Sequence, residues 1–269
     1  MHDLREKIIM VLIVAAFFVG SGWAFVHFAH PFDPPGLRVD PETHCVVDGT
    51  LPAHTVIVFD QSNSFEQRDH DWFETILREE TRLLPEGGML SLYSIAENPA
   101  ANAPVFTLCS PGGDIDWANE NSRRALSRYD AFIEDAARHA GETTTLTTSA
   151  TTPLLETILD LADRPQFTPD VPRRRLIIIS DMMQNTANYD FYRDIPEIDR
   201  LIDADAEILE ADFSNVCVMA KMVRRAATAE RRRRLKDFWE NYFAETGTEL
   251  YWVRRLTSGL CPLSIDSSQ

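Results

Sequence analysis

The most restrictive feature of the sequence is a continuous apolar run, RRLIIISD, at residues 174–181. Its isoleucines are β-branched and favour a strand, and the run lacks the alternation of apolar and polar residues that a half-buried strand shows. A strand that is apolar on both faces is typical of a parallel sheet covered by helices on both sides. The run therefore predicts that the chain folds around a mostly parallel β-sheet.

Predicted strands and helices alternate along the rest of the chain, and no internal repeat occurs. This alternation is typical of an α/β fold with an open, doubly wound, mostly parallel sheet flanked by helices on both faces, as in Rossmann-like proteins. The predicted strands are 55–60, 89–95, 104–109, 174–181, 215–220 and 248–253, and the predicted helices are 71–84, 119–140, 153–162 and 226–245.

Polar residues follow the predicted strands where such a sheet binds ligands, at the carboxyl ends of the strands. Asp60, Ser62 and Ser64 follow the first strand, Asp181 ends the most apolar strand, and Thr152 ends the loop before a helix. Two carboxylates and three hydroxyls form an all-oxygen set of ligands, which suits Mg²⁺ and does not suit zinc or copper. Such a set also leaves a coordination position that a carboxylate of a partner could fill.

Each of these residues also has an ordinary structural explanation. Asp60 could cap the following helix, Ser62 and Ser64 could make hydrogen bonds within a turn, and Thr152 could cap the helix 153–162. All of them occur at positions where the fold predicts a ligand site, and this conjunction favours the metal site.

The segments DQSNS, TTPLLETI and LIIISDM resemble the von Willebrand factor A (VWA) family, in particular its bacterial membrane-anchored members, over about residues 50–255. The resemblance implies a metal-ion-dependent adhesion site (MIDAS) in which Asp60, Ser62 and Ser64 match the first loop, Thr152 the second and Asp181 the third. It also implies Mg²⁺, or Mn²⁺ or Ca²⁺, as the cofactor, and a protein partner that offers an Asp or Glu carboxylate to the metal.

The sequence departs from the pattern of this family at two places. Ser149-Ala150-Thr151 stands where the usual Gly-Gly precedes the threonine, and Met182 stands where a glycine usually follows the aspartate. We expect Met182 to place a bulky side chain beside the metal.

The first thirty residues form a separate segment. Ile8 to Ala29 is an apolar run that is long enough for a helix to span a bilayer. Arg5 and Lys7 precede it, which favours a cytoplasmic N terminus and an extracytoplasmic domain, periplasmic in a bacterium. The alternative is a signal peptide whose cleavage gives a secreted protein. The predicted organisation is a cytoplasmic N terminus (1–7), a transmembrane anchor (8–29), a Pro-rich linker (30–50), a VWA-like domain (51–256) and a C-terminal tail (257–269).

Four cysteines are an even number in a chain that we expect to leave the cytosol, so the sequence predicts one or two disulfides. Cys45 and Cys109 flank loops and are the favoured pair, although sequence alone allows three pairings. Cys217 lies in the apolar run NVCVMA, and we interpret it as a buried free thiol.

The net charge of −16 at pH 7 argues against a nucleic-acid partner, because binding to phosphates needs a basic face. The basic runs Arg173–Arg175 and Arg231–Arg234 are interpreted as solvated faces. Segment 184–214 has nine acidic residues and two arginines, and we interpret it as an acidic surface helix and loop. A second interpretation is that this segment borders the metal face and repels acidic competitors.

Binding is favoured over catalysis as the function. The hypothesis is a membrane-tethered domain that captures a protein partner through the metal, in adhesion or in the assembly of a complex. A metal-assisted hydrolase is the alternative from another class, but no histidine falls at a predicted strand exit, and no P-loop, GxSxG or HExxH motif occurs. A third hypothesis is a structural scaffold that has the same fold and no metal.

Overall fold

A computed structural model describes residues 38–60, 67–95, 103–113, 122–143, 151–223 and 228–253 of the chain. The chain divides into two compact units, Met1–Arg38 and Val39–Gln269. The predicted transmembrane anchor at residues 8–29 lies outside the described residues. Of the helices that the structure describes, none is long and apolar enough to cross a bilayer.

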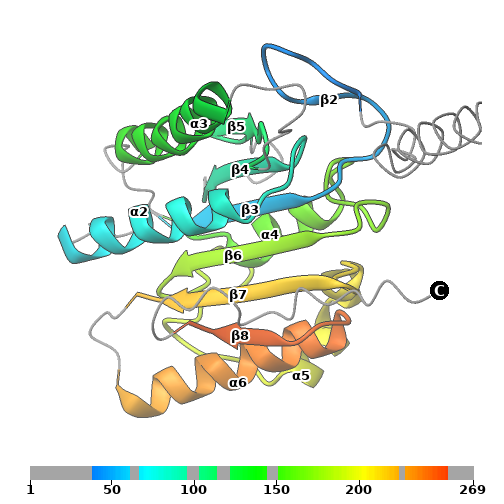
Figure 1. Ribbon diagram of the computed structural model, residues 1–269. Coiled ribbons are helices and arrows are strands. Elements are labelled where there is room, and N and C mark those ends of the chain that lie inside the picture. The colour runs from blue at the N-terminus through cyan, green and yellow to red at the C-terminus, as the bar shows by residue number, and fades with distance from the viewer. Residues whose placement is uncertain are drawn as a thin grey trace, which may run out of the picture. The chain divides into compact units, whose positions relative to one another are not determined.

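The second unit contains a six-stranded sheet in the order β5-β4-β3-β6-β7-β8 (Figure 1). All neighbouring strands are parallel except the edge strand β5, which is antiparallel to β4. The mostly parallel sheet and its six strands are thus confirmed. The strands are β3 (His54–Phe59), β4 (Met89–Ser94), β5 (Phe106–Cys109), β6 (Arg174–Ser180), β7 (Val216–Met222) and β8 (Leu250–Trp252).

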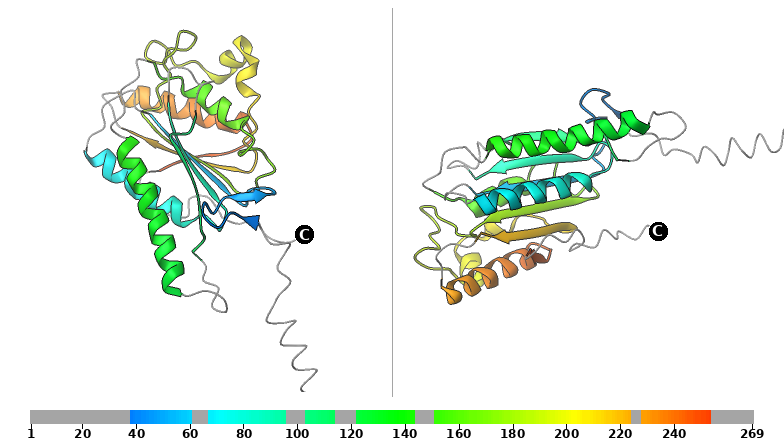
Figure 2. Two further views of the ribbon diagram at one scale, coloured as in Figure 1. Left: turned by 90° about the horizontal axis from the view of Figure 1, so that it is seen from above. Right: turned by 60° about the vertical axis from the view of Figure 1, so that its left-hand side comes forward.

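Helices cover both faces of this sheet (Figure 2). The helices of one face, which share a hydrophobic core with the sheet, are α2 (Gln67–Arg82) and α3 (Ser122–Thr143). The elements that share a second core with the opposite face are α4 (Leu154–Ala162), α5 (Ile198–Ala204), the 3₁₀ helix η2 (Ala206–Leu209) and α6 (Ala229–Glu245). The predicted doubly wound arrangement is therefore confirmed.

The two cores explain why the central strands are apolar throughout. Successive side chains of a strand point to opposite faces of the sheet. In β6, Leu176 and Ile178 therefore belong to the core of α4 and α6, whereas Ile177 and Ile179 belong to the core of α2 and α3. Each fully buried side chain of this size contributes about 1.5–3 kcal/mol to folding.

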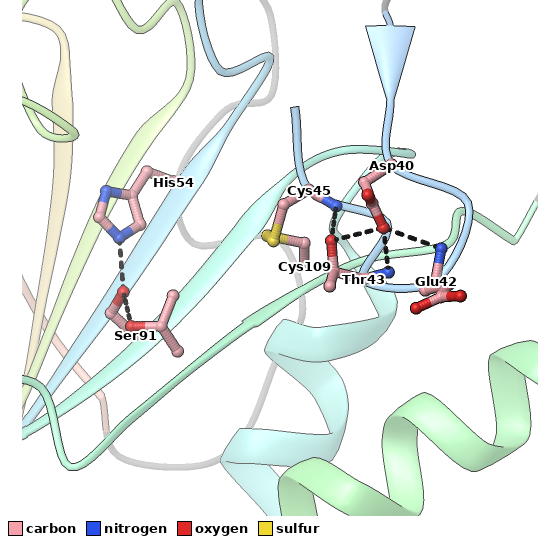
Figure 3. Close-up of a disulfide and its surroundings, with 8 residues drawn as sticks. Asp40, Glu42, Thr43, Cys45, His54, Ser91 and Cys109 are labelled. Atoms are coloured by element: carbon pink, nitrogen blue, oxygen red, sulfur yellow. Dashed lines mark hydrogen bonds between the residues drawn. A yellow bond between two sulfur atoms is a disulfide. The ribbon is translucent and has the colours of Figure 1, made fainter. Parts of the chain in front are cut away.

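The edge at which the parallel strands begin carries a disulfide between Cys45 and Cys109 (Figure 3). Cys109 ends the antiparallel strand β5 and lies opposite Met89, the first residue of β4. The predicted pairing of these two cysteines is confirmed. Cys45 lies in the predicted linker, in which residues also form two short strands, β1 (Arg38–Val39) and β2 (Val46–Asp48).

The interpretation of Cys217 as a free thiol is wrong. Cys217 is disulfide-bonded, and none of the cysteines within the described ranges is free. Its position near the start of β7 gives it a partly buried side chain on the α2 and α3 face of the sheet. A cysteine inside an apolar strand has the same sequence environment whether it is paired or free, so the apolar run could not distinguish the two states.

The interpretation of Arg173–Arg175 as a solvated face is also wrong for two of its residues. Arg174 is buried and donates to the carbonyls of Phe167 at 3.0 Å and Ser214 at 2.6 Å. Arg175 forms an ion pair with the buried Glu80 at 2.8 Å. Both arginines therefore fasten loops and α2 to the beginning of β6.

Candidate metal centre

The two predicted carboxylate ligands follow neighbouring parallel strands. Asp60 directly follows β3 and Asp181 directly follows β6, and these strands pair with each other. The backbone N–H of Asp60 donates to the carbonyl of Ile179 at 2.9 Å, which extends the pairing to the strand ends. Asp60 is 4% exposed and Asp181 is 8% exposed. The structure thus places both carboxylates at one edge of the sheet and largely buries them.

Ser180 joins the first and third predicted loops. Its hydroxyl donates to Oδ2 of Asp60 at 2.6 Å and accepts from the backbone N–H of Met182 at 2.8 Å. Oδ1 of Asp181 accepts from the backbone N–H of Met183 at 3.0 Å. Both carboxylates therefore have fixed orientations. The alternative explanation that Asp60 caps the next helix is wrong, because α2 begins only at Gln67.

Thr152 lies at the same edge, because its loop pairs with the segment after β6. Its backbone N–H and carbonyl exchange hydrogen bonds of 2.9 Å with Asn185. The N-cap residue of α4 is Pro153, whose own side chain makes no capping hydrogen bond. The hydroxyl of Thr152 is therefore not used as a helix cap, although the residue is only 2% exposed. Ser62 and Ser64, the other two predicted ligands, lie outside the described residues.

Gln184 is a positioning residue that the sequence did not reveal. Its Oε1 accepts from the backbone N–H of Leu155 at 2.9 Å, in the first turn of α4. Its Nε2 donates to Glu156 at 2.7 Å and to Thr186 at 3.3 Å. The buried amide thus ties the second loop to the third. The sequence indicates this role only by an amide side chain three residues after the aspartate that follows β6.

Met182 occupies its position at the cost of backbone strain. Its φ of 66° lies in the left-handed region, which glycine adopts freely and which a side chain disfavours. Its side chain is fully buried and belongs to the core shared by β6 and α6. Its carbonyl accepts from Nε1 of Trp239 at 2.9 Å. The bulk that we expected beside the metal is thus accommodated in the core.

The donors at this edge match a hard divalent cation in their chemistry. The described ones are two carboxylates and one hydroxyl, all oxygen, from three loops that hydrogen bonds connect. Within the described ranges, no group of three or more His, Cys, Asp or Glu is arranged to bind a metal. A metal site at this edge would therefore need hydroxyl ligands in addition to its two carboxylates. Such a set of oxygen ligands suits a hard divalent cation and does not suit zinc.

No family model matches the chain, and no curated protein matches it. Among solved structures, an aerotolerance-related membrane protein from Bacteroides fragilis is similar at 15% identity, over 75% of this chain and 91% of that chain, with a TM-score of 0.38. The PilB minor pilin from Streptococcus sanguinis is similar at 9% identity, over 79% and 58%, with a TM-score of 0.43. The SpRpn10 VWA domain is similar at 12% identity, over 75% and 86%, with a TM-score of 0.35.

The assignment of the fold rests on the strands and helices themselves, since these identities and TM-scores are low. Strands and helices alternate along the chain as predicted, and an aspartate directly follows β6, the fourth strand of the sheet in chain order. The sheet is parallel except at one edge, and helices cover both faces. The chain has a VWA-like α/β fold.

Proposed function

We propose that this chain is a membrane-tethered, extracytoplasmic VWA-like domain that binds a protein partner through a divalent metal ion. The ligands would be Asp60, Ser62, Ser64, Thr152 and Asp181. A bound Mg²⁺ or Mn²⁺ would supply a free coordination position for an Asp or Glu carboxylate of the partner. The observation that supports this most is the meeting of Asp60, Thr152 and Asp181 at one edge of the sheet.

Hydrogen bonds already orient candidate ligands of this site in the protein. Ser180 holds the Asp60 carboxylate, and the pairing with Asn185 holds the loop of Thr152. Ligands that are fixed in advance lose less conformational freedom when they bind an ion. This arrangement supports a binding site more than a solvated strand exit.

Tethering to a membrane is supported by the apolar run from Ile8 to Ala29. The disulfide between Cys45 and Cys109 supports a domain on the oxidising side of that membrane, because disulfides are rare in the cytosol.

Metal binding is tested on the full chain in neutral detergent by thermal unfolding and calorimetry with Mg²⁺ and Mn²⁺. At a hundredfold excess over the Kd, the ion is expected to stabilise the fold by about 2.7 kcal/mol. Asp60→Asn and Asp181→Asn remove one ligand charge each with little change in shape, and we expect both to abolish this stabilisation.

Asp212→Asn is the matched control, because the exposed Asp212 precedes β7 at the opposite edge of the sheet. This variant should keep the response to metal. A partner retained with Mg²⁺ should be released by EDTA and should not bind Asp181→Asn. An unfolding midpoint that excess Mg²⁺ and Mn²⁺ leave unchanged would contradict the metal site and favour the scaffold.

A further inference from the structure

A small cavity lies at the beginning of α6, on the edge of the sheet that carries the candidate metal centre. Helix α6 begins at this edge, where β6 and β7 end (Figure 1), and Trp239 binds the loop after β6 through the carbonyl of Met182. The cavity has a volume of about 150 Å³ and lies between the first turns of α6 and the segment 191–195. Thr228 caps the helix there by accepting from the N–H of Arg231 at 3.2 Å.

Three arginines line this cavity from two sides: Arg193 from the segment after β6, and Arg231 and Arg234 from α6. Arg231 donates to the carbonyl of Tyr192 at 2.9 Å. Arg234 donates to the carbonyl of Ile195 and to Asp194. Arg233 and Arg234 are exposed, as expected for a solvated face, and Arg231 and Arg234 also make these hydrogen bonds to the segment after β6.

Arg193 differs from the other two, because its guanidinium makes no hydrogen bond or ion pair with any other described residue. Its backbone N–H is held by Asp190, which fixes the turn that carries it. The side chain is exposed. Arg193 therefore offers five N–H donors to a ligand while its backbone stays in place.

The cavity is locally positive in a chain of strongly negative net charge. Two acids, Asp194 and Glu230, also line it. Asp194 forms ion pairs with Arg200 at 2.6 Å and with Arg234 at 3.1 Å, and these hydrogen bonds lower its pKa. Its charge is thus largely balanced by Arg200 from outside the cavity. The N terminus of the 17-residue helix α6 adds further positive potential.

We propose that this arginine-lined cavity receives a carboxylate side chain from an acidic segment of the protein partner. The inference rests on the proposed function for the existence of that partner, and it adds a second anchor beside the metal. Planar guanidinium groups match a carboxylate in a bidentate geometry. Tyr192 is 45% exposed next to the cavity, and Tyr and Arg dominate the energetics of protein interfaces.

The charge distribution disfavours other anionic partners. A nucleic acid needs an extended basic surface, whereas the rest of this chain is acidic and would repel a polyanion. The acidic segment 197–212 lies next to the cavity along the chain and would repel an acidic segment that docks in the wrong place. Complementary charge at one point and like charge around it favour a single docking position.

The test measures binding of a labelled ten-residue peptide rich in Glu, Asp and Leu to the full chain in neutral detergent, with Mg²⁺ and with EDTA. The same peptide with Gln and Asn in place of the acids is the negative control. We expect Arg193→Gln and Arg231→Gln each to weaken binding by about tenfold, as for other interfacial charge pairs. Arg233→Gln removes the same charge from the same helix outside the cavity, and it should change binding less than about twofold.

The outcomes separate this inference from the metal site. Loss of binding in Arg193→Gln but not in Arg233→Gln supports the cavity, even if EDTA has no effect and the metal hypothesis fails. Binding that depends on Mg²⁺ but is equal in both variants would overturn the cavity and leave the metal site standing. Vesicles of phosphatidylglycerol that bind through Arg193 when the peptide does not would likewise overturn the assignment to an acidic protein segment.

Discussion

His54, the first residue of β3, is a buried histidine with a hydrogen-bond partner at each ring nitrogen. Figure 3 shows its hydrogen bond to Ser91. It is 2% exposed, and its Nδ1 lies 2.7 Å from the carbonyl of Gln166, which can only accept. Nδ1 therefore carries the proton, and Nε2 accepts from the hydroxyl of Ser91 at 2.9 Å. Ser91 in turn lies 3.2 Å from the hydroxyl of Thr107 on β5. This chain of hydrogen bonds joins three strands and needs a neutral imidazole.

Stability is expected to fall between pH 7 and pH 5 because of His54. Burial lowers the pKa of its imidazole to about 4, from an ordinary value of 6.5. Between these two values the unfolded chain binds a proton that the folded chain does not bind, so the free energy of unfolding falls as the pH falls. The expected loss is about 2 kcal/mol from pH 7 to pH 5, as measured by urea unfolding.

His54→Gln should be less stable at pH 7, because it disrupts the network, and should lose most of this pH dependence. His139→Gln is the control, since His139 stacks on Phe106 and leaves the network of His54 intact. A wild-type protein whose unfolding free energy is the same at pH 7 and pH 5 would contradict the neutral, buried histidine.

Single residues show what the sequence could and could not reveal about the site. Asp60, Thr152 and Asp181 could be placed at one edge because the two aspartates follow recognisable strands and Thr152 precedes a recognisable helix. Ser180 and Gln184 were not recognised as positioning residues, because their roles depend on partners 120 and 29 residues away in the chain. The buried arginines Arg174 and Arg175 were misjudged for the same reason, since Glu80 is 95 residues from Arg175. The spacing of residue types along a chain indicates the period of a helix or a strand. It does not indicate which residues far apart in the sequence will contact each other.

At the scale of elements, the start of α4 depends on the segment after β6. The amide of Gln184 satisfies the N–H of Leu155 and donates to Glu156 and Thr186. A helix start has several N–H groups without partners inside the helix, and here a distant side chain supplies one acceptor. The end of the loop at Thr152 is therefore held both by its pairing with Asn185 and by the contact of Gln184 with the first turn of α4.

Gln184→Glu is expected to destabilise the fold by about 2 kcal/mol, because it replaces a donor to Glu156 with a second buried carboxylate. The exchange Glu156→Gln/Gln184→Glu restores one amide and one carboxylate, so it should recover most of this loss. Urea unfolding of both single variants and the double variant measures the coupling. Independent, additive effects of the two substitutions would contradict the direct contact of Gln184 with Glu156.

The longer elements could be predicted from sequence because their patterns are strong. All six strands of the sheet and the four predicted helices occur, with ends that differ by a few residues. The predicted helix at 226–245 occurs as α6, and its apolar face is buried through Phe238, Trp239 and Tyr242. The short elements β1, β2 and η2 span two to four residues each, which is too few to establish a period. Their bounds came only from the structure.

For the second unit, Val39–Gln269, the two edges of the sheet have different roles. Asp60, Thr152 and Asp181 lie where the parallel strands end, together with the start of α6. His54, Arg174 and the disulfide of Cys45 and Cys109 lie where these strands begin. Changes at the second edge should therefore alter stability without altering binding at the proposed metal site.

The disulfide between Cys45 and Cys109 tests this separation. It closes a loop with a sequence separation of 64, and constraint of the unfolded chain by a loop of this length contributes about 4 kcal/mol in the chain-entropy description. Cys45→Ser/Cys109→Ser should lose stability of this order in urea unfolding, while its affinity for Mg²⁺ in calorimetry stays within about twofold of the wild type.

Mass spectrometry of the unreduced full chain should find peptides joined through Cys45 and Cys109. Cys217 is also disulfide-bonded. We therefore expect that none of Cys45, Cys109 and Cys217 is alkylated in denaturant without a reductant. Alkylation of any of these three cysteines under those conditions would contradict their pairing. A loss of Mg²⁺ affinity in Cys45→Ser/Cys109→Ser would show that the two edges are coupled and not independent.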